Sequence, residues 1–330
     1  MNFGELEILH HKVLTRTVTD FAFPELLGLG LFPEERVEGI TAQWDILSPA
    51  RQKGTFRVPG EPAARVELER VGSRTASCIL MLLEKALDEA TLAWLRLAGE
   101  EDVASARARI TAEEAALARR IDLAKEWAVW QALTGQLVID QPNLKLTVDY
   151  GLDESHKPEV STSWSSSSAD IPADVRAWKK LIAQDSGYIA GEAFVNEGVM
   201  ESMVKNENVK DVIGETSLKE QLAQEGYITR FLGLNWHVYD AGYLDASDTF
   251  HSFIPDDTVI FLPSQKVYGR MQVGTQEVPA GYSETVRVYG RFAYAVTQSN
   301  PPGVNLYVGE NFLPVITLPG AVVCADVSAS

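Results

Sequence analysis

The sequence predicts an α+β protein that carries a long finger, and three observations lead to this class. Strand patterns flank a stretch rich in proline and glycine between residues 42 and 77. One helical segment, residues 100–134, is much longer than an average helix. Strand and helix patterns then alternate over residues 170–263, and strand patterns alone follow residue 285.

The finger, residues 42–77, is the segment least able to stabilise itself. Apolar and polar residues alternate over 40–46 and again over 66–69, which predicts two strands. Arms of roughly 12–15 residues would reach about 40–50 Å, whereas the whole chain has an expected radius of gyration of about 20 Å. Since an isolated two-stranded ribbon is at best marginally stable, we expect the finger to complete its folding on another copy of the chain. The residues that shape its tip are Pro49, Gly54, Pro59, Gly60 and Pro62.

Composition sets broad limits on the protein. The 330 residues suggest two domains, or one domain with large insertions. A net charge of −17 argues against a basic face that grips nucleic acid, but it is compatible with enclosing DNA without binding it. Cys78 and Cys324 lie among apolar residues, which favours buried free thiols in a reducing cytosol. We expect no signal peptide and no membrane span, because the apolar run 21–32 is too short to cross a bilayer.

The first half of the chain reads in order as arm, finger and helix. Residues 1–36 form an arm, whose apolar part is either a strap across the core or a contact with a neighbour. Residues 79–83 are a buried strand or the start of a helix, and 88–97 form a short helix. The long helix has one apolar face and ends at Gly135, and Thr111 with Glu114 has the spacing of a capping box, so a restart is expected there. The predicted face comprises Ile110, Leu117, Ile121, Ala124 and Ala128; these positions keep no strict heptad, which disfavours a coiled coil.

The second half begins with a strand over 144–150 and a serine-rich stretch, 161–168, interpreted as a linker or domain crossing. A helix follows Asp170, with Pro172 in its first turn. Residues 188–195 form a strand and Asn196 starts a helix, while Ser217 with Glu220 predicts another helix start. Further strands cover 234–239 and 258–262.

We find no motif that indicates catalysis. Gly28 and Gly30 lack the third glycine of a dinucleotide site. The five histidines are scattered, and the aspartates between 240 and 257 lack the spacing of a calcium loop. The sequence therefore predicts neither an enzyme nor a cofactor or metal site.

Charge is unevenly distributed along the chain. Residues 46–75 carry six basic and three acidic residues, a net +3, and residues 196–257 carry twelve acidic and four basic residues, a net −8. A basic finger and an acidic body are complementary between copies, and such complementarity sets register and association rate more than affinity. Chance clustering on solvated surfaces is the alternative. The candidate contact residues of the finger are Arg51, Lys53, Phe56, Arg57, Arg65, Arg70 and Arg74.

The order of these parts resembles the lambda-type major capsid protein of tailed phages, the phage protein E family. The similar pieces are FPEERV before the finger, the VPGEPAA tip, the long RARITAEEAALARRIDLAKEWAVWQALTG segment, TSWSSSSADIPADVRAWKKL, EAFVNEGVMESMVKNENVKDVI and FIPDDTVIFLPSQKVYGRMQVG. Together they span nearly the whole chain.

The resemblance implies a Hong Kong 97-type capsid fold. It would divide the chain into an N-terminal arm (1–41), the extended E-loop (42–77), a peripheral domain with the spine helix (78–164), an axial domain (165–283), further peripheral strands (284–318) and a C-terminal strand that returns to the axial domain (319–330). It also implies a shell of hexamers and pentamers around double-stranded DNA, located in the virion and assembled in the host cytoplasm. A scaffolding protein, a portal and a decoration protein are the implied partners. Some related phages cross-link a lysine to a neighbour's asparagine, for which Lys53 and Asn311 are formal candidates.

Three alternatives remain at the level of sequence. The first is an encapsulin-like compartment with the same fold. The second is an enzyme whose site is assembled from distant residues, and the third is a tail-tube or other virion component.

Overall fold

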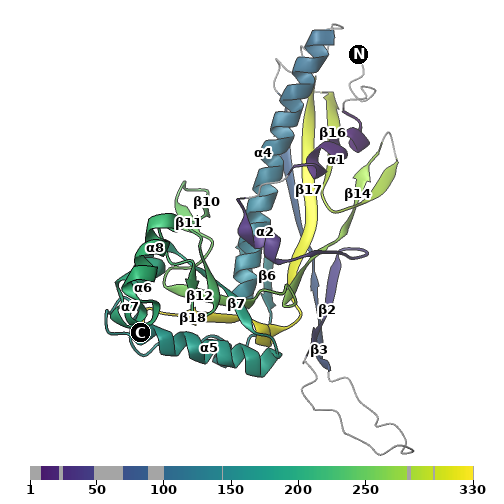
Figure 1. Ribbon diagram of the computed structural model, residues 1–330. Coiled ribbons are helices and arrows are strands. Elements are labelled where there is room, and N and C mark those ends of the chain that lie inside the picture. The colour runs from purple at the N-terminus through teal and green to yellow at the C-terminus, as the bar shows by residue number, and fades with distance from the viewer. Residues whose placement is uncertain are drawn as a thin grey trace, which may run out of the picture. The chain divides into compact units, whose positions relative to one another are not determined.

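The computed structural model describes residues 9–21, 25–47, 70–87, 100–142, 144–280, 284–299 and 302–329, and the chain divides into two compact units. Unit 1 comprises 1–42, 75–128 and 270–314, and unit 2 comprises 43–74, 129–269 and 315–330. Figure 1 shows the elements in chain order.

The helices are α1 (His11–Thr19), α2 (Leu27–Leu31), α4 (Glu100–Leu133), α5 (Ile171–Ser186), α6 (Glu197–Lys205), α7 (Glu207–Ile213) and α8 (Glu215–Glu225), with 3-10 turns η3 (Glu154–His156) and η4 (Pro319–Ala321). The strands up to the middle of the chain are β1 (Glu34–Arg36), β2 (Thr41–Leu47), β3 (Arg70–Ser77), β4 (Ile79–Ala86), β5 (Gln136–Gln141), β6 (Leu144–Asp149), β7 (Ala190–Val195), β8 (Arg230–Phe231) and β9 (Leu234–Val238). The remaining strands are β10 (Gly242–Leu244), β11 (Phe250–Ser252), β12 (Thr258–Pro263), β13 (Gly269–Val273), β14 (Thr275–Pro279), β15 (Thr285–Tyr289), β16 (Phe292–Ser299), β17 (Pro302–Ile316) and β18 (Val323–Asp326).

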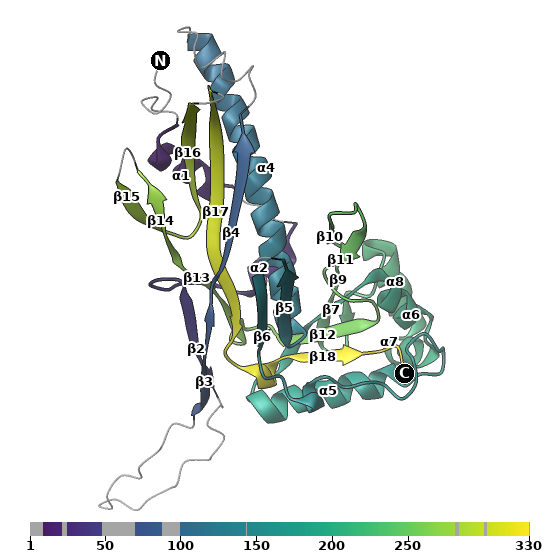
Figure 2. The ribbon, with the colours of Figure 1, turned by 180° about the vertical axis from the view of Figure 1, so that it is seen from behind.

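Unit 1 is built on a sheet of order β1-β13-β17-β16, with β4 also paired to β17. Strands β4 and β16 run antiparallel to β17, and Figure 2 shows the three side by side. The core of this unit joins α1, α4 and the sheet through Leu14, Val18, Ile110, Ile121 and Leu306. Helix and sheet are therefore held by one continuous apolar layer.

Helix α4 confirms the long helical segment. Its 34 residues give a length of about 51 Å. Four of the five predicted face residues are buried and Ala124 is half-buried, and Gly135 ends the helix with a φ of +101°, a conformation that glycine adopts without strain. The predicted restart at Thr111 is wrong, because α4 is continuous through it and Glu114 points into the protein instead of capping a turn.

Unit 2 is built on a sheet of order β18-β12-β7-β9-β8. Strands β7 and β9 are parallel, and the other pairs are antiparallel. Helix α5 covers this sheet with Val175, Trp178 and Ile182, as its apolar pattern predicts. Asp170 caps α5 by accepting from the Ala173 N–H at 3.1 Å.

In unit 2 the structure contradicts the linker interpretation of the serine-rich stretch, but not its alternative as a domain crossing, and it contradicts one predicted helix start. The serine-rich stretch is not a free linker: Trp164 is 1% exposed, stacks on Trp178 at 5.5 Å between ring centroids and donates to Asp174. The predicted helix start at Ser217 lies inside α8, which begins at Glu215 after Gly214. Trp164 is held by side chains of the helix that follows it, α5, which the composition of the serine-rich stretch does not reveal.

Candidate functional site

The base of the finger is a pair of strands, β2 and β3. Along β2 the residues Ala42, Trp44 and Ile46 are buried and alternate with more exposed ones, as predicted. The rings of Trp44 and Tyr150 are 6.3 Å apart, and the Leu47 N–H donates to the Thr317 carbonyl at 2.8 Å. These contacts anchor the last part of β2 in unit 2, so the finger starts from a fixed strand.

Most of the predicted contact residues of the finger lie outside the described residues. Those are Arg51, Lys53, Phe56, Arg57 and Arg65, together with the predicted strand 66–69. Arg70 begins β3. Arg74, on β3, donates to the Asp149 carbonyl, and its guanidinium lies 3.6 Å from the Asp149 carboxylate. Arg74 therefore ties β3 to β6 within the chain, and the contact of these residues with a neighbour remains a prediction.

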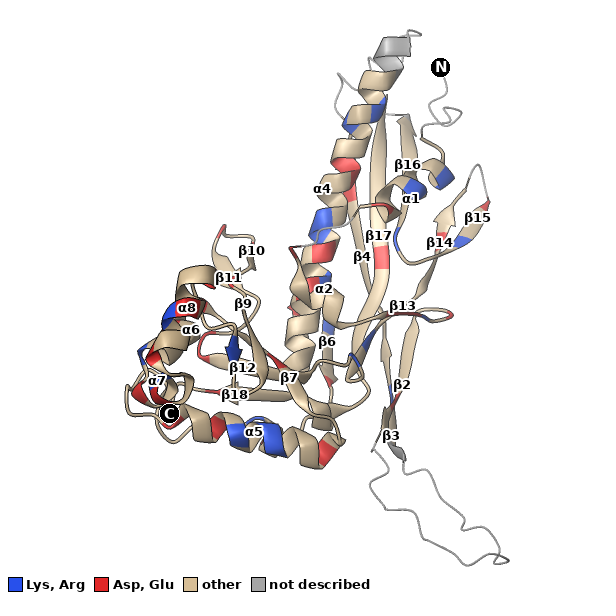
Figure 3. Cartoon of the chain, in the orientation of Figure 1, with Lys and Arg blue, Asp and Glu red and all other residues tan. Residues whose placement is uncertain are grey.

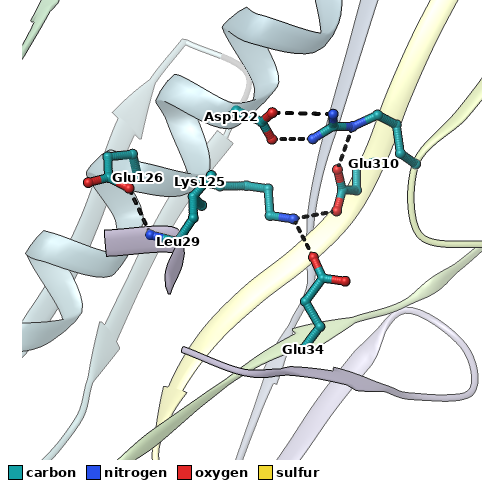
Figure 4. Close-up of polar contacts among 7 residues, drawn as sticks. Leu29, Glu34, Asp122, Lys125, Glu126 and Glu310 are labelled. Atoms are coloured by element: carbon teal, nitrogen blue, oxygen red, sulfur yellow. Dashed lines mark hydrogen bonds and ion pairs between the residues drawn. The ribbon is translucent and has the colours of Figure 1, made fainter. Parts of the chain in front are cut away.

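The strongest polar feature of unit 1 is a charge cluster, defined as Glu34, Asp122, Lys125, Arg291 and Glu310 (Figure 4). Its members are largely buried except Glu34, whose side chain is 66% exposed. Lys125 Nζ lies 2.7 Å from Glu310 Oε1 and 3.0 Å from Glu34 Oε1. Arg291 Nε lies 3.1 Å from Glu310 Oε2, and the same guanidinium holds both carboxylate oxygens of Asp122. The cluster thus fastens α4 to β17, to β1 and to the residue that precedes β16.

Electrostatics explains why Glu310 and Lys125 stay charged although they are buried. Burial raises the pKa of Glu310, but Lys125 and Arg291 together outweigh burial and lower it. Burial likewise lowers the pKa of Lys125, and the two glutamates more than reverse this. Each of these buried charges faces at least one opposite charge at hydrogen-bond distance, which is the condition for keeping ions in a protein interior.

Beside the cluster, Glu126 binds the start of α2. Its two carboxylate oxygens accept from the backbone N–H groups of Gly28 at 2.7 Å and Leu29 at 2.8 Å. A Cβ at position 28 would lie 2.8–2.9 Å from this carboxylate, so a larger residue there would displace the carboxylate from its present position. The apolar strap predicted over 21–32 is therefore fixed to the chain's own helix at this point.

A cavity of about 640 Å³ adjoins the cluster and is lined by all five of its members and by Arg36. Three acidic and three basic groups line it, so their charges cancel, and the five cluster members are paired with one another. Arg36 also lies 6.0 Å from the centre of the Tyr289 ring. The cavity consequently has no net charge with which to select an ionic ligand.

The described part of the chain does not offer the side-chain grouping of a metal site. It contains no group of three or more His, Cys, Asp or Glu side chains placed to hold a metal ion. Three of the described histidines have side-chain or backbone partners: His156 contacts the Val322 carbonyl and Asp185, His237 contacts Glu192, and His251 contacts Asp245. No helix of the described residues is both long and apolar enough to span a membrane.

Asn311 is not displayed for cross-linking. It is 2% exposed, and its amide nitrogen donates to the Thr275 carbonyl and to the Gln276 side chain, both at 3.0 Å. Breaking these bonds would be the first requirement for any reaction of this amide, which argues against the candidate role suggested by its residue type.

Acidic side chains recur on the helices and loops of unit 2 (Figure 3). The pairs Glu201–Lys205 and Glu215–Lys219 are exposed and contribute little to stability. The acidic residues between 196 and 257 therefore act mainly through their summed field.

The charge cluster was not predicted from the sequence. Asp122, Lys125 and Glu126 are spaced so that they share one side of α4, next to the apolar face. Their spacing was a usable signal, but an exposed salt-bridged helix gives the same pattern, and the partners lie 91 to 185 residues away.

Solved structures place the fold among capsid proteins. The chain matches a protein assigned as the capsid protein of a prophage from Escherichia coli CFT073, with a TM-score of 0.65 and 15% identity over 97% of this chain and 99% of that one. It matches a phage-related protein from Bordetella bronchiseptica RB50 with a TM-score of 0.60 and 13% identity over 97% and 98%. The SrpI encapsulin of Synechococcus elongatus PCC 7942 matches with a TM-score of 0.50 and 8% identity over 93% and 89%. The fold is thus the Hong Kong 97-type capsid fold, which encapsulins share.

The family model separates these possibilities. Residues 12–327 match the model of phage major capsid protein E. This chain belongs to that family, as its sequence pattern suggested. No curated protein sequence matches the chain.

Proposed function

We propose that this chain is the subunit of the icosahedral head of a tailed phage, assembling as hexamers and pentamers around double-stranded DNA. The match of residues 12–327 to the major capsid protein E family carries the proposal. The net charge of −17 supports it, since an acidic wall repels DNA phosphates and leaves packaged DNA free to slide. Its role is structural, and it resides in the virion.

The test is electron microscopy of the purified protein under assembly conditions. We expect closed spherical particles. Helical tubes would point to a tail component, and a monomer at micromolar concentration would contradict the proposal. Particles that contain a cargo protein and no phage DNA when isolated from cells would favour an encapsulin-like compartment.

Within the shell, the finger 42–77 acts as a clasp on the adjacent subunit. Two observations support this role: β2 is anchored at its base, and the finger segment 46–75 has a net charge of +3 in a chain whose net charge is −17. The acidic residues of 196–257 are the charge complement that a neighbour offers. We propose that the segments 78–164 and 284–318 form the peripheral domain and 165–283 with 319–330 the axial domain.

Deleting residues 50–63 tests the clasp. We expect soluble, folded subunits that form no shells, because the deletion spares the contacts at the base of β2. A matched variant, Arg51→Gln with Lys53→Gln and Arg57→Gln, keeps the length of the finger and removes three charges. Slower assembly of this variant would assign the contact to charge, and unchanged assembly would assign it to the backbone. Normal particles from the deletion would refute the clasp.

We further propose assembly in the host cytoplasm with a scaffolding protein, a portal and a decoration protein. Co-purification of such proteins with particles from infected or induced cells would test each partner separately.

A further inference from the structure

Helix α1 is a short element that depends on its neighbours. It has nine residues, and its N-cap, His10, accepts from the Lys12 N–H at 3.3 Å, a long hydrogen bond. A helix of this length is not stable by itself in water. Its docking within unit 1 therefore supplies its stability.

Two features dock α1. Leu14 and Val18 are buried in the core that α1 shares with α4. The Thr15 hydroxyl donates to the Ala293 carbonyl and accepts from the Ala293 N–H, both at 3.1 Å. Since Ala293 belongs to β16 at the edge of its sheet, Thr15 occupies both backbone groups that this residue would offer to another strand.

The interface between α1 and α4 contains an unpaired carboxyl group. Glu114 of α4 is 1% exposed, and its Oε1 has no hydrogen-bond partner among the described residues. It lines a cavity of about 260 Å³ together with Val13, Leu14 and Thr17 of α1 and Arg107, Ile110 and Thr111 of α4. An ionised carboxylate in such a place costs far more than a neutral one. Burial raises the pKa of Glu114 to about 8.

Among the described residues, no nearby charge offsets this cost. Burial alone accounts for the raised pKa, so Arg107 does not stabilise the carboxylate although it lines the same cavity. Lys85 of β4 lies 3.6 Å from the carboxylate of Glu113, the residue that precedes Glu114 in α4, and pairs with that residue. On α1 itself, the buried ionisable group is His11. The sheet faces this core with apolar side chains of β16 and β17.

We propose that α1 is a latch on α4 and β16 that stays closed while the Glu114 carboxyl is protonated and opens when it ionises. Opening places the carboxylate in water and uncovers the N–H and C=O of Ala293 on the β16 edge. Free strand edges pair with other strands, so the latch controls when this edge becomes available to a second copy of the chain.

The direction of the pH effect follows from proton linkage. Between pH 4.5, the ordinary pKa of a glutamate, and about pH 8, the closed state keeps a proton on Glu114 that the open state has lost. The stability that this proton gives to the closed state is complete below pH 4.5, falls as the pH rises toward 8, and does not change further above that pH. His11 acts in the opposite direction, because burial and then His10 and Lys12 lower its pKa from 6.5. The effect of His11 on the opening of α1 is confined to pH values below about 6.5. Above that pH, the change in opening is due to Glu114.

Hydrogen exchange of the α1 amides in the full-length, unassembled chain tests the latch. After correction for the intrinsic pH dependence of exchange, the opening constant of α1 should rise about 15-fold between pH 6.5 and 8. Glu114→Gln keeps the size of the side chain without its titration and should abolish the rise. Glu113→Gln removes the neighbouring charge and should retain it.

Two results would overturn the latch: an opening constant of the unmodified chain that does not change over this range, or the same rise in Glu114→Gln. If glutamine releases α1 already at pH 6.5, Glu114→Leu replaces it. A pH-independent opening constant in the leucine variant supports the proposal, and a rise of about 15-fold refutes it.

Discussion

Glu310 shows how a single residue of β17 can organise an entire unit. Its carboxylate is bound by Lys125 from α4 on one oxygen and by Arg291 on the other. Lys125 and Arg291 hold Glu34 and Asp122 in turn, so removal of Glu310 leaves two cations with incomplete partners in a buried place. Buried ion pairs are weak evidence for net stabilisation, but breaking one is strongly unfavourable.

We therefore expect Glu310→Gln to lower the free energy of unfolding by about 3–5 kcal/mol, because the neutral amide cannot compensate two buried cations. Chemical denaturation of the soluble subunit measures the change.

The matched control for this variant is Glu277→Gln. Glu277 pairs with Arg287 at the surface, where both side chains are more than 60% exposed, and its loss should cost less than about 0.5 kcal/mol. Equal effects at the two positions would contradict the role assigned to Glu310.

At the scale of single elements, sequence patterns predicted the structure correctly where a residue faces either solvent or core, or where it bonds to the nearest turn of its own helix. The periodicity of α4, the alternation along β2 and the caps at Asp170 and Asn196 all correspond to the structure. Each depends on local hydrogen bonding or on a simple division into buried and exposed faces.

Sequence patterns gave the wrong local structure where contacts with another element determine the environment of a residue. Thr111 and Glu114 have the spacing of a capping box, but the approach of α1 buries Glu114 in a helix interior. The serine run has the composition of a linker, but Asn206 fixes it by donating to the carbonyls of Ser166, Ser167 and Ala169. The charge cluster could not be predicted for the same reason, since its members come from α4, β1, β17 and the residue before β16.

The anchoring of α2 gives a prediction for one element. Gly28→Ala should destabilise the chain by about 1–3 kcal/mol, because the new Cβ would lie 2.8–2.9 Å from the Glu126 carboxylate and disturb its hydrogen bonds to α2. Thermal unfolding of the soluble subunit reports this loss.

Gly30→Ala serves as the internal comparison. It lies in the same helix, and a Cβ there meets nothing within 4 Å. We expect it to be neutral or to stabilise the chain slightly through helix propensity. A loss of stability at position 30 as large as at position 28 would show that the glycines serve the helix in general and not the approach of Glu126.

For the whole molecule, the dominant physical quantity is its net charge. Subunits of charge −17 must come together in the proposed shell, and the finger is the basic exception. Repulsion acts over the whole surface, whereas attraction between a basic finger and an acidic neighbour acts at close range. The two contributions therefore differ in their response to salt, because screening removes long-range interactions first.

We expect assembly to be slower at about 0.01 M salt than at about 0.15 M, since the Debye length falls from about 30 Å to about 8 Å and repulsion between approaching subunits falls with it. Light scattering at fixed protein concentration measures the rate, with sucrose at equal osmolarity as a control for solvent activity. The variant with three neutral residues in the finger has a net charge of −20, so it should be slower at both concentrations and gain more from added salt. Identical curves for the unmodified chain at the two salt concentrations would show that its charge does not control shell formation.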